Sequence, residues 1–415
     1  MKKSSTSKCP ICQAAESETI HTLSCGNLDD SKLYPTLRIN ICLWCGHTFN
    51  ELSPQELNGL NHYYSFEYAP ANLHATDTKA DRPGSAGELT SDRYSQLYSA
   101  ISPHIREQQE ILDVGCALGG FLDYLGRRGF SQLSGVDMAA AYVEQAQKKN
   151  QYRVELGNAE SLPFAAHTFD AIVMEQVLEH LFNPVQAFRE ARRVLKRGGI
   201  FCIGVPDASR YADFYFFDFY WLLLREHIQH FDVDHLNLLA MNAGFEMLSC
   251  HQTTHAVTSE RMVMPNLYAV FQATGSVETM RKNHPDGSRL KPQMLDYIDK
   301  EKSRQLSKSR KLAELNKSRR PVYVWGIGRE FLYLYESAGL KNCNIAGLID
   351  GNNFKQTSGS VNGMKIAASD LLRQAAPDSV LLITAIAHME PIKDTARAQG
   401  FRGEIFDLDT DGSLS

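Results

Sequence analysis

Short hydrophobic runs that end in glycine-rich turns alternate with longer amphipathic stretches over much of the chain. Ile111–Val114 is one such run, and the glycine-rich segment 115–120 after it leads into apolar residues at helical spacing. This pattern predicts a buried strand, a turn and a helix that starts near Gly119. Leu133–Asp137 follows as a second strand that ends in a carboxylate. Because the alternation continues from about residue 90 to 274, we predict an α/β domain whose parallel sheet is covered by helices.

The same pattern returns near the carboxyl end of the sequence. Val322–Trp325 is followed by a turn with Gly326 and Gly328, and Asp350 comes after a further hydrophobic run. We therefore predict a second, half-Rossmann α/β domain. A dinucleotide fingerprint has its third glycine where this chain has Phe331, so we expect no independent NAD site.

Composition narrows the class of protein. With 415 residues, of which 43% are hydrophobic, the chain is expected to form more than one globular domain. Its net charge of -5 argues against a dedicated nucleic-acid binder. The longest apolar stretch, Phe214–Leu224, contains Asp218 and is too short to span a bilayer, so no membrane association is expected. No apolar run follows the basic first residues, which predicts a cytoplasmic protein without a signal peptide.

Two Cys-x-x-Cys pairs lie near the amino terminus. Each pair can place two thiolates on one tight turn, and two such turns give tetrahedral sulfur coordination of zinc. We predict a structural zinc site, with reduced thiols or redox chemistry as the alternative. Four sulfur ligands leave no open position, so the metal is assigned no chemistry. The predicted ligands are Cys9, Cys12, Cys42 and Cys45, and the nearby Cys25, His21 and His47 are possible replacements.

A charged segment rich in Lys, Arg, Glu, Gln and Ser separates the two α/β domains, as is typical of solvated helices. A further segment, 77–87, is rich in charge, Gly and Pro and predicts a mobile loop. We thus predict four parts: a zinc-binding domain over 1–75, the α/β core over 88–275, a helical charged linker over 276–320 and the half-Rossmann domain over 321–415.

The predicted core brings several residues to one edge of its sheet. Ligands of parallel sheets bind at the carboxyl ends of the strands, which places Gly115, Asp137, Asn158, Glu175 and Pro206 around one cleft. A glycine turn lets backbone approach a ligand closely. A carboxylate at the end of the second strand accepts hydrogen bonds from both hydroxyls of a ribose. The pattern therefore predicts a nucleoside-containing ligand.

The motifs of this core resemble those of the S-adenosylmethionine-dependent methyltransferases with a Rossmann-like sheet. The run 113–119 resembles their first motif, with Ala117 where the pattern has its middle glycine, and 157–164, 169–180 and 193–199 resemble later motifs in the same order. The resemblance implies that S-adenosyl-L-methionine is the cofactor. The cofactor-binding residues that it implies, together with the strand ends, are Asp113, Gly115, Cys116, Gly119, Asp137, Met138, Asn158, Ala159 and Glu175.

Three further segments are candidates for substrate binding or catalysis. Tyrosines in 62–70 are suited to gripping a sugar or aromatic substrate, although packing between domains explains them equally well. The aromatic stretch 211–221 follows a strand end and predicts either a cap on the substrate pocket or a packing helix. In the pair Glu226-His227 the histidine is suited to removing a proton near neutral pH, and a turn-forming role is the alternative.

The order of a zinc-binding domain, a methyltransferase core and a small Rossmann-like domain is similar to that of the sugar C-methyltransferases, which add a methyl branch to nucleotide-linked deoxy-ketosugars. This resemblance implies a nucleotide-diphospho-sugar as substrate, held in part by both flanking domains. Two positions depart from the family pattern, with Gln176 in place of an asparagine and Leu224 in place of a tyrosine. The implied catalytic residues are His180, Glu226 and His227, and the expected substrate-binding residues are Tyr64, Tyr68, Gln176 and His230.

The implied reaction removes a proton next to a ketone and passes the resulting enolate to the sulfonium methyl group. We expect His227 to be the base, Glu226 to orient it and His180 to contact the ketone oxygen. O-methylation of a sugar or other small molecule is the alternative reaction. A non-catalytic cofactor-binding scaffold is a third possibility. The sequence does not identify the acceptor or the oligomeric state.

Overall fold

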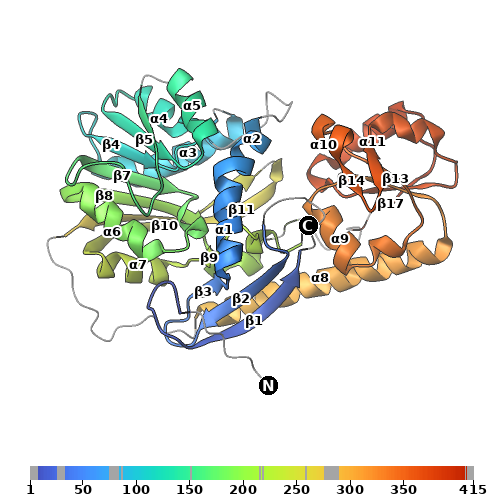
Figure 1. Cartoon of the computed structure of the whole chain (residues 1–415), viewed down its shortest axis with the longest axis horizontal. Helices are drawn as coiled ribbons and strands as arrows, with labels where there is room; N and C mark the ends of the chain where they lie inside the picture. The colour runs from blue at the N-terminus through green and yellow to red at the C-terminus, as the bar shows by residue number, and fades with distance from the viewer. Residues whose placement is uncertain are drawn as a thin grey trace. The chain divides into compact units, whose positions relative to one another are not determined.

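The computed structural model gives the fold of most of the chain (Figure 1). Contacts divide the chain into two compact units, the first formed by 1–22, 31–215 and 222–297 and the second by 23–30, 216–221 and 298–415. The structure describes residues 8–25, 33–73, 84–85, 87–149, 152–214, 216, 219–257, 259–274, 289–406 and 408. Most of the loop predicted for 77–87 lies outside these residues. Three residues of the aromatic stretch, Tyr215, Phe217 and Asp218, also lie outside them.

A seven-stranded sheet forms the centre of the first unit, in the order β10-β11-β8-β7-β4-β5-β6. Neighbours from β8 to β6 pair in parallel, as predicted. The two last strands differ from the prediction, because β10 and β11 form a hairpin and β11 pairs antiparallel with β8. The strands are β4 (Ile111–Val114), β5 (Leu133–Asp137), β6 (Arg153–Leu156), β7 (Phe169–Glu175), β8 (Leu195–Pro206), β10 (Phe245–Val257) and β11 (Ser259–Ala273).

Helices cover both faces of this sheet (Figure 1). Successive residues of a strand point to opposite faces of the sheet and therefore pack into opposite hydrophobic cores. Leu112 packs with residues of α6 and α7, whereas its neighbour Ile111 packs with residues of α3, α4 and α5. Asn183 caps the start of α6, since its side chain accepts a hydrogen bond from the amide of Gln186. The helices are α3 (Glu88–Ile101), α4 (Gly120–Gly126), α5 (Ala140–Lys149), α6 (Pro184–Val194) and α7 (Val233–Asn242).

The amino-terminal part of the first unit contributes a smaller, four-stranded sheet in the order β1-β2-β3-β9. Its strands are β1 (Ser17–Ser24), β2 (Thr36–Cys42), β3 (Thr48–Asn50) and β9 (Gln229–His230). β9 comes from a distant part of the sequence and pairs antiparallel with β3. The chain continues from β3 into α1 (Pro54–His62), a π-helix (Tyr63–Glu67) and α2 (Tyr68–Leu73).

The second unit contains the half-Rossmann fold that the sequence predicts. Its sheet has the order β14-β15-β13-β12-β16-β17, and all neighbours except β14 and β15 pair in parallel. The strands are β12 (Val322–Trp325), β13 (Ile345–Ile349), β14 (Ser360–Val361), β15 (Met364–Ala367), β16 (Val380–Ile383) and β17 (Glu404–Phe406). The helices are α9 (Arg329–Ser337), α10 (Asn353–Ser358) and α11 (Met389–Ala398).

The predicted charged linker contains one long helix, α8 (Leu290–Ser318). Short 3-10 helices occur at Ser102–His104, Leu178–His180, Ala208–Asp213, Trp221–Leu223, Leu340–Asn342, Ser369–Gln374 and Ile386–His388. In the part of the chain that the structure describes, no helix combines the length and the hydrophobicity needed to cross a bilayer.

Candidate functional site

The turn after β4 has an unusual backbone. Gly115, Ala117 and Gly119 all have positive φ angles, of 79°, 45° and 77°. A side chain at Gly115 would place its Cβ 2.3 Å from a methyl group of Val177, so only glycine fits there. Alanine is rarely left-handed, because its Cβ then crowds the following carbonyl. Residues in such conformations persist where the surrounding structure fixes them, often at ligand-binding sites.

Asp137, at the end of β5, fixes this turn. One carboxylate oxygen accepts a hydrogen bond of 2.9 Å from the Ala117 amide, and the other accepts one of 2.9 Å from the Ala139 amide. The Asp137 backbone carbonyl accepts a further bond of 3.0 Å from Gly157, which begins the segment that carries Asn158. The predicted turn, strand end and loop therefore meet at one place. Each Asp137 oxygen keeps acceptor capacity for a ribose hydroxyl.

Buried acidic groups surround the same strand ends. Burial, followed by the charges of Glu175 and Asp137, raises the pKa of Asp113 to about 8. Burial likewise raises the pKa of both Asp137 and Glu175. Arg93 on α3 is a cation near them, with Nε 3.2 Å from Glu175. S-adenosylmethionine carries a sulfonium and an ammonium group, so this excess of carboxyl groups fits its charge.

The remaining predicted cofactor residues contribute in different ways. Ala159 is buried and Met138 is half-buried beside Asp137. The Asn158 side chain accepts a hydrogen bond of 3.0 Å from the Glu160 amide. The Cys116 side chain belongs to the hydrophobic core around α4, so only the backbone of this residue is available to a ligand.

One segment of the amino-terminal part reaches from the cofactor turn to the predicted catalytic residues. Tyr68 and the fully buried Ala69 pack in one apolar cluster with Ala117 and Ala139. One turn earlier, the Tyr64 hydroxyl lies 2.7 Å from Nδ1 of His180. A π-helix carries Tyr64, and such helices often occur at functional sites. The two expected substrate-binding tyrosines thus join the two halves of the candidate site.

His180 has a defined tautomer. Its Nδ1 lies 2.9 Å from the backbone carbonyl of Glu226, which only accepts hydrogen bonds, so Nδ1 carries the proton. The Tyr64 oxygen then also accepts from Nδ1, and its own proton is available to a ligand. Burial lowers the pKa of His180 and raises that of Tyr64 well above its usual value, so both groups are neutral near pH 7.

His227 lies beside His180, with ring centroids 5.0 Å apart. The Glu226 carboxylate accepts a hydrogen bond of 3.4 Å from the Tyr63 hydroxyl, so a phenol reaches this residue although Leu224 stands where the family has tyrosine. The structure therefore brings together all three predicted catalytic residues.

β3 fixes the position of the Glu226-His227 pair. The Asn50 side-chain amide donates a hydrogen bond of 2.9 Å to the His227 carbonyl, and the Asn50 backbone amide donates one of 2.9 Å to Ile228. His47 and Gln229 are joined by a side-chain hydrogen bond of 2.8 Å. These bonds attach the predicted catalytic pair to the strand that follows Cys45.

Two of the expected substrate-binding residues face other parts of the protein. The Gln176 side chain donates a hydrogen bond of 2.8 Å to Asn266 on β11, and its backbone has a strained φ of 54°. His230 is fully buried, and its Nε2 lies 3.3 Å from the Asn50 side chain. Burial lowers the pKa of His230 to about 3. These positions favour a structural role for both residues.

The four predicted zinc ligands form a compact cluster. The sulfur atoms of Cys9 and Cys45 are 3.7 Å apart, and those of Cys12 and Cys42 are 3.6 Å apart. Tetrahedral zinc with Zn–S bonds of about 2.3 Å separates its sulfurs by roughly 3.8 Å, so the residues fit the metal. The amides of Trp44 and Cys45 point at the Cys42 sulfur, at 3.4 and 3.5 Å, as suits a thiolate.

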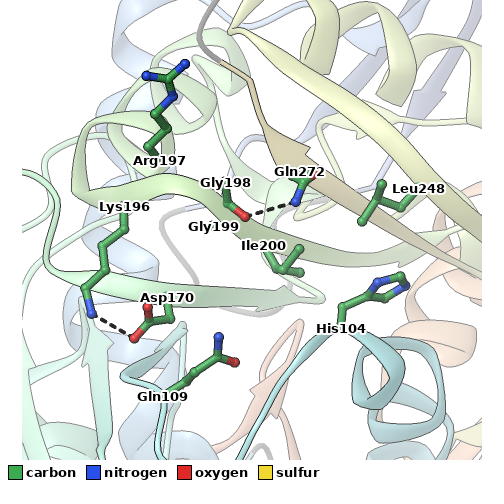
Figure 2. Close-up of a pocket in the computed structure, with 10 residues that line it drawn as sticks. All are labelled: His104, Gln109, Asp170, Lys196, Arg197, Gly198, Gly199, Ile200, Leu248 and Gln272. Atoms are coloured by element: carbon green, nitrogen blue, oxygen red, sulfur yellow. Dashed lines mark hydrogen bonds and ion pairs between the residues drawn. The ribbon is translucent and has the colours of Figure 1, made fainter.

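A cavity of about 460 Å³ lies at the opposite ends of the strands of the large sheet. Figure 2 shows the residues that line it. It involves Asp170 at the start of β7, whereas Glu175 at the end of that strand belongs to the candidate site. Two of its polar contacts are within the cavity lining, with Lys196 2.8 Å from Asp170 and Gln272 3.2 Å from the Gly198 carbonyl. This cavity is therefore not part of the candidate site.

Sequence reasoning missed several residues of the site. Arg93 lies in a predicted helix, and nothing in its local pattern distinguishes it from a surface arginine. Asn50 contacts His227 of the predicted catalytic pair across 177 positions, and periodicity does not predict such contacts. Glu179 stands beside a predicted catalytic histidine, and its place in the motif 169–180 was the available signal.

The middle part of the chain is similar to known methyltransferases. Residues 87–250 match the family model described as a methyltransferase domain. The erythromycin 3''-O-methyltransferase of Saccharopolyspora erythraea is 35% identical over 133 residues, which cover 30% of this chain and 43% of the relative. A ubiquinone/menaquinone biosynthesis C-methyltransferase of Sinorhizobium fredii is 35% identical over 113 residues, or 25% of this chain and 43% of the relative.

The matched segments thus span less than half of either relative. A crystal structure of an S-adenosylmethionine-dependent methyltransferase from Methanosarcina mazei aligns with a TM-score of 0.36 and 21% identity, over 43% of this chain and 98% of that one. Residues 87–250 of this chain are thus similar to a methyltransferase domain.

Proposed function

We propose that this protein transfers a methyl group from S-adenosylmethionine to the carbon next to the ketone of a nucleotide-linked deoxy-ketosugar. The observation that carries the proposal is the segment around Tyr64 and Tyr68. It packs on the cofactor turn at Ala117 and also lies 2.7 Å from His180, so a cofactor and a proton-accepting group share one site.

Residues of the strand ends provide the cofactor site. Asp137 accepts from the ribose hydroxyls, and the positive charges of a bound ligand would favour the ionised forms of Asp113 and Glu175. Arg93 lies beside Glu175 and is suited to the carboxylate of the methionine part. S-adenosylmethionine, when bound, supplies the electrophilic methyl group.

His227 is the proposed base. It takes the proton from the carbon next to the ketone, and the C–H electron pair becomes that of the enolate, whose carbon forms the new C–C bond to the methyl group. The electron pair of the broken sulfur–methyl bond would stay with the departing thioether. An oxyanion develops on the ketone oxygen and needs a hydrogen-bond donor. Because Nε2 of His180 carries no proton, the Tyr64 hydroxyl suits this oxygen better than His180 does. His180 then positions Tyr64, and Glu226 helps to orient the base.

The nucleotide part of the acceptor rests on the resemblance of the whole chain to the sugar C-methyltransferases. Within the second unit itself, the Ile327 amide in the glycine turn after β12 donates a hydrogen bond of 2.8 Å to Asp350. Lys355 lies 2.9 Å from the same carboxylate. A nucleotide-diphosphate carries negative charge and ribose hydroxyls, and a lysine beside a carboxylate is suited to both.

We further propose that Cys9, Cys12, Cys42 and Cys45 bind one structural zinc ion. The sulfur spacing supports this assignment, and four sulfur ligands leave no position for substrate. The metal would stabilise the turn before β3, and β3 in turn pairs with β9 beside the Glu226-His227 pair.

O-methylation is the second candidate reaction, because one relative is named as an erythromycin 3''-O-methyltransferase. The two reactions differ in the bond that is broken. A carbon base removes a C–H proton, so deuterium from heavy water enters the acceptor next to its ketone. A hydroxyl acceptor gives no such exchange.

The test incubates the protein with labelled S-adenosylmethionine and a panel of nucleotide-linked ketosugars and hydroxy sugars, in ordinary and heavy water. We expect label transfer to a ketosugar and enzyme-dependent deuterium uptake. His227→Asn is expected to abolish both, with unchanged cofactor affinity. Label transfer without exchange would establish O-methylation, and tight cofactor binding without transfer to any acceptor would favour a non-catalytic scaffold.

A further inference from the structure

Glu179 is a buried carboxyl group whose role the proposed reaction does not explain. It is 1% exposed, and neither of its carboxylate oxygens has a hydrogen-bond partner outside its own residue among the residues that the structure describes. Its Oε1 lies 3.8 Å from Nε2 of His180, which is too far for a hydrogen bond. Burial of a polar group without a partner costs free energy. The site therefore favours a ligand that Oε1 of Glu179 and Nε2 of His180 can both bind.

The tautomer of His180 identifies the chemistry of such a ligand. Because Nδ1 donates its proton to the Glu226 carbonyl at 2.9 Å, Nε2 presents a lone pair towards Glu179. Metal-binding histidines commonly donate their other ring N–H to a backbone carbonyl in this way. A nitrogen lone pair and a carboxylate oxygen that face each other have an affinity for a cation.

His227 provides a third ligand. One possible ligand atom each from Glu179, His180 and His227 lies within 4.8 Å of the others. Two ligands of a tetrahedral zinc-sized ion, with bonds of about 2.0–2.2 Å, lie roughly 3.3–3.6 Å apart, so closure of the three ligand atoms by up to about 1.5 Å completes the site. Two imidazoles and one carboxylate suit zinc, cobalt or iron rather than magnesium or calcium.

We propose that Glu179, His180 and His227 form a second metal site, which takes a divalent transition cation and inhibits the enzyme. Its ligands are nitrogen and oxygen, so it is chemically distinct from the cysteine cluster. The inhibition rests on the proposed function: a cation on His227 occupies the lone pair that removes the proton. Binding of the cation does not depend on that function.

Cobalt(II) is the probe, because its visible spectrum reports the ligands directly. Protein with zinc in its cysteine cluster is titrated with Co²⁺, and bound cobalt is counted after gel filtration. We expect one Co²⁺ per chain, with visible bands but no sulfur-to-cobalt charge-transfer band. Replacement of zinc at the cysteines would produce that charge-transfer band, so the two sites are distinguished.

Two variants locate the site, and a third variant serves as the control. Glu179→Gln, which keeps the shape of the side chain, is expected to weaken Co²⁺ binding at least tenfold, and His180→Gln is expected to do the same. Asp170→Asn, at the opposite edge of the sheet, is expected to leave binding unchanged. Absence of a Co²⁺ ion beyond the cysteine cluster, or equal binding by both site variants and wild type, overturns the proposal.

Kinetics then tests inhibition. Methyl transfer by wild type is expected to fall to half at the cation concentration that half-saturates the spectrum, whereas Glu179→Gln keeps its activity at that concentration. A rate of methyl transfer that rises with Co²⁺, or that is unchanged when the site is saturated with Co²⁺, overturns the inhibitory role. If wild type binds Co²⁺ but methylates no acceptor, the metal site stands and the proposed function fails.

Discussion

The Tyr64 hydroxyl and the His180 ring lie 2.7 Å apart although 116 positions separate them in the sequence. The Glu226 carbonyl fixes the proton of His180 on Nδ1, so the Tyr64 oxygen accepts and its proton remains free. Burial keeps both groups neutral near pH 7. A neutral phenol with an available proton is suited to stabilise a developing oxyanion, so in the proposed reaction Tyr64 takes the role that the sequence analysis expected of His180.

Tyr64→Phe is expected to lower kcat by about 10²–10³-fold, the usual cost of removing one oxyanion donor. Cofactor affinity should not change, because the ring of residue 64 still packs. Steady-state kinetics and calorimetric titration measure the two quantities. Tyr98→Phe on α3 is the control and should affect neither. A Tyr64→Phe enzyme with wild-type kcat would exclude the phenol from the reaction.

Asp137→Asn is expected to weaken S-adenosylmethionine binding by about 1.5–3 kcal/mol, the scale for hydrogen bonds to a charged group. The amide NH₂ would also face an N–H of Ala117 or Ala139 that the carboxylate now accepts. Asp170→Asn, at the far edge of the same sheet, is the matched control (Figure 2). Equal affinities for the two variants in calorimetry would remove Asp137 from the cofactor site.

The central strands could be predicted from sequence because each is a short apolar run with a sharp end. Ile111–Val114 and Leu133–Asp137 have the predicted bounds. The sequence analysis did not predict the hairpin of β10 and β11. Only one position lies between these two long strands, and their polar residues do not alternate strictly with apolar ones. Antiparallel pairing with β8 follows from that hairpin and not from a local pattern.

The candidate site was only partly predictable for a physical reason. Asp137 and Gly115 are fixed by local geometry at a strand end, which sequence patterns report. The pairing of β3 with β9 joins the zinc-binding part to the segment after His227, and no periodicity encodes that contact. Local motifs were thus enough to predict a function from the sequence. The positions of the proposed catalytic groups depend on long-range hydrogen bonds, which such motifs do not contain.

Zinc is expected at one ion per chain, and Cys42→Ser should lose it together with part of the folded amino-terminal structure. Metal analysis and circular dichroism of protein purified without chelator test this. Cys25→Ser is the control, because Cys25 lies outside the four-cysteine cluster. Methyl transfer should be lost in parallel with folding. Full zinc content in Cys42→Ser, or none in wild type, contradicts the assignment.

Asn50 is expected to act as a positioning residue for the catalytic pair. Asn50→Ala removes bonds of 2.9 Å to the His227 carbonyl and 3.2 Å to the Tyr34 hydroxyl, and should cost about 1–3 kcal/mol of unfolding free energy. It should lower kcat more than cofactor affinity. Asn50→Asp should be worse, because a carboxylate would face the carbonyl. Asn237→Ala, on the outer side of α7, is the control for both measurements.

His255 provides a pH test of folding stability. The side chain is 3% exposed, and burial, with a smaller effect of Arg93, lowers its pKa to about 3. Between pH 3 and the ordinary histidine pKa near 6.5, the unfolded chain therefore binds a proton that the folded protein does not bind. The stability that this residue contributes falls as the pH falls, by about 1.4 kcal/mol per pH unit.

His255→Gln removes this proton uptake. The unfolding free energy of the variant is expected to fall less steeply below about pH 6, so the difference in slope from wild type should approach 1.4 kcal/mol per pH unit. Denaturant unfolding at pH 7, 6 and 5 measures the two slopes. His251→Gln, an exposed position on the same strand, should follow wild type. Parallel curves for His255→Gln and wild type would show that His255 is protonated in the folded protein, and the buried environment of β10 would then have to admit the charge.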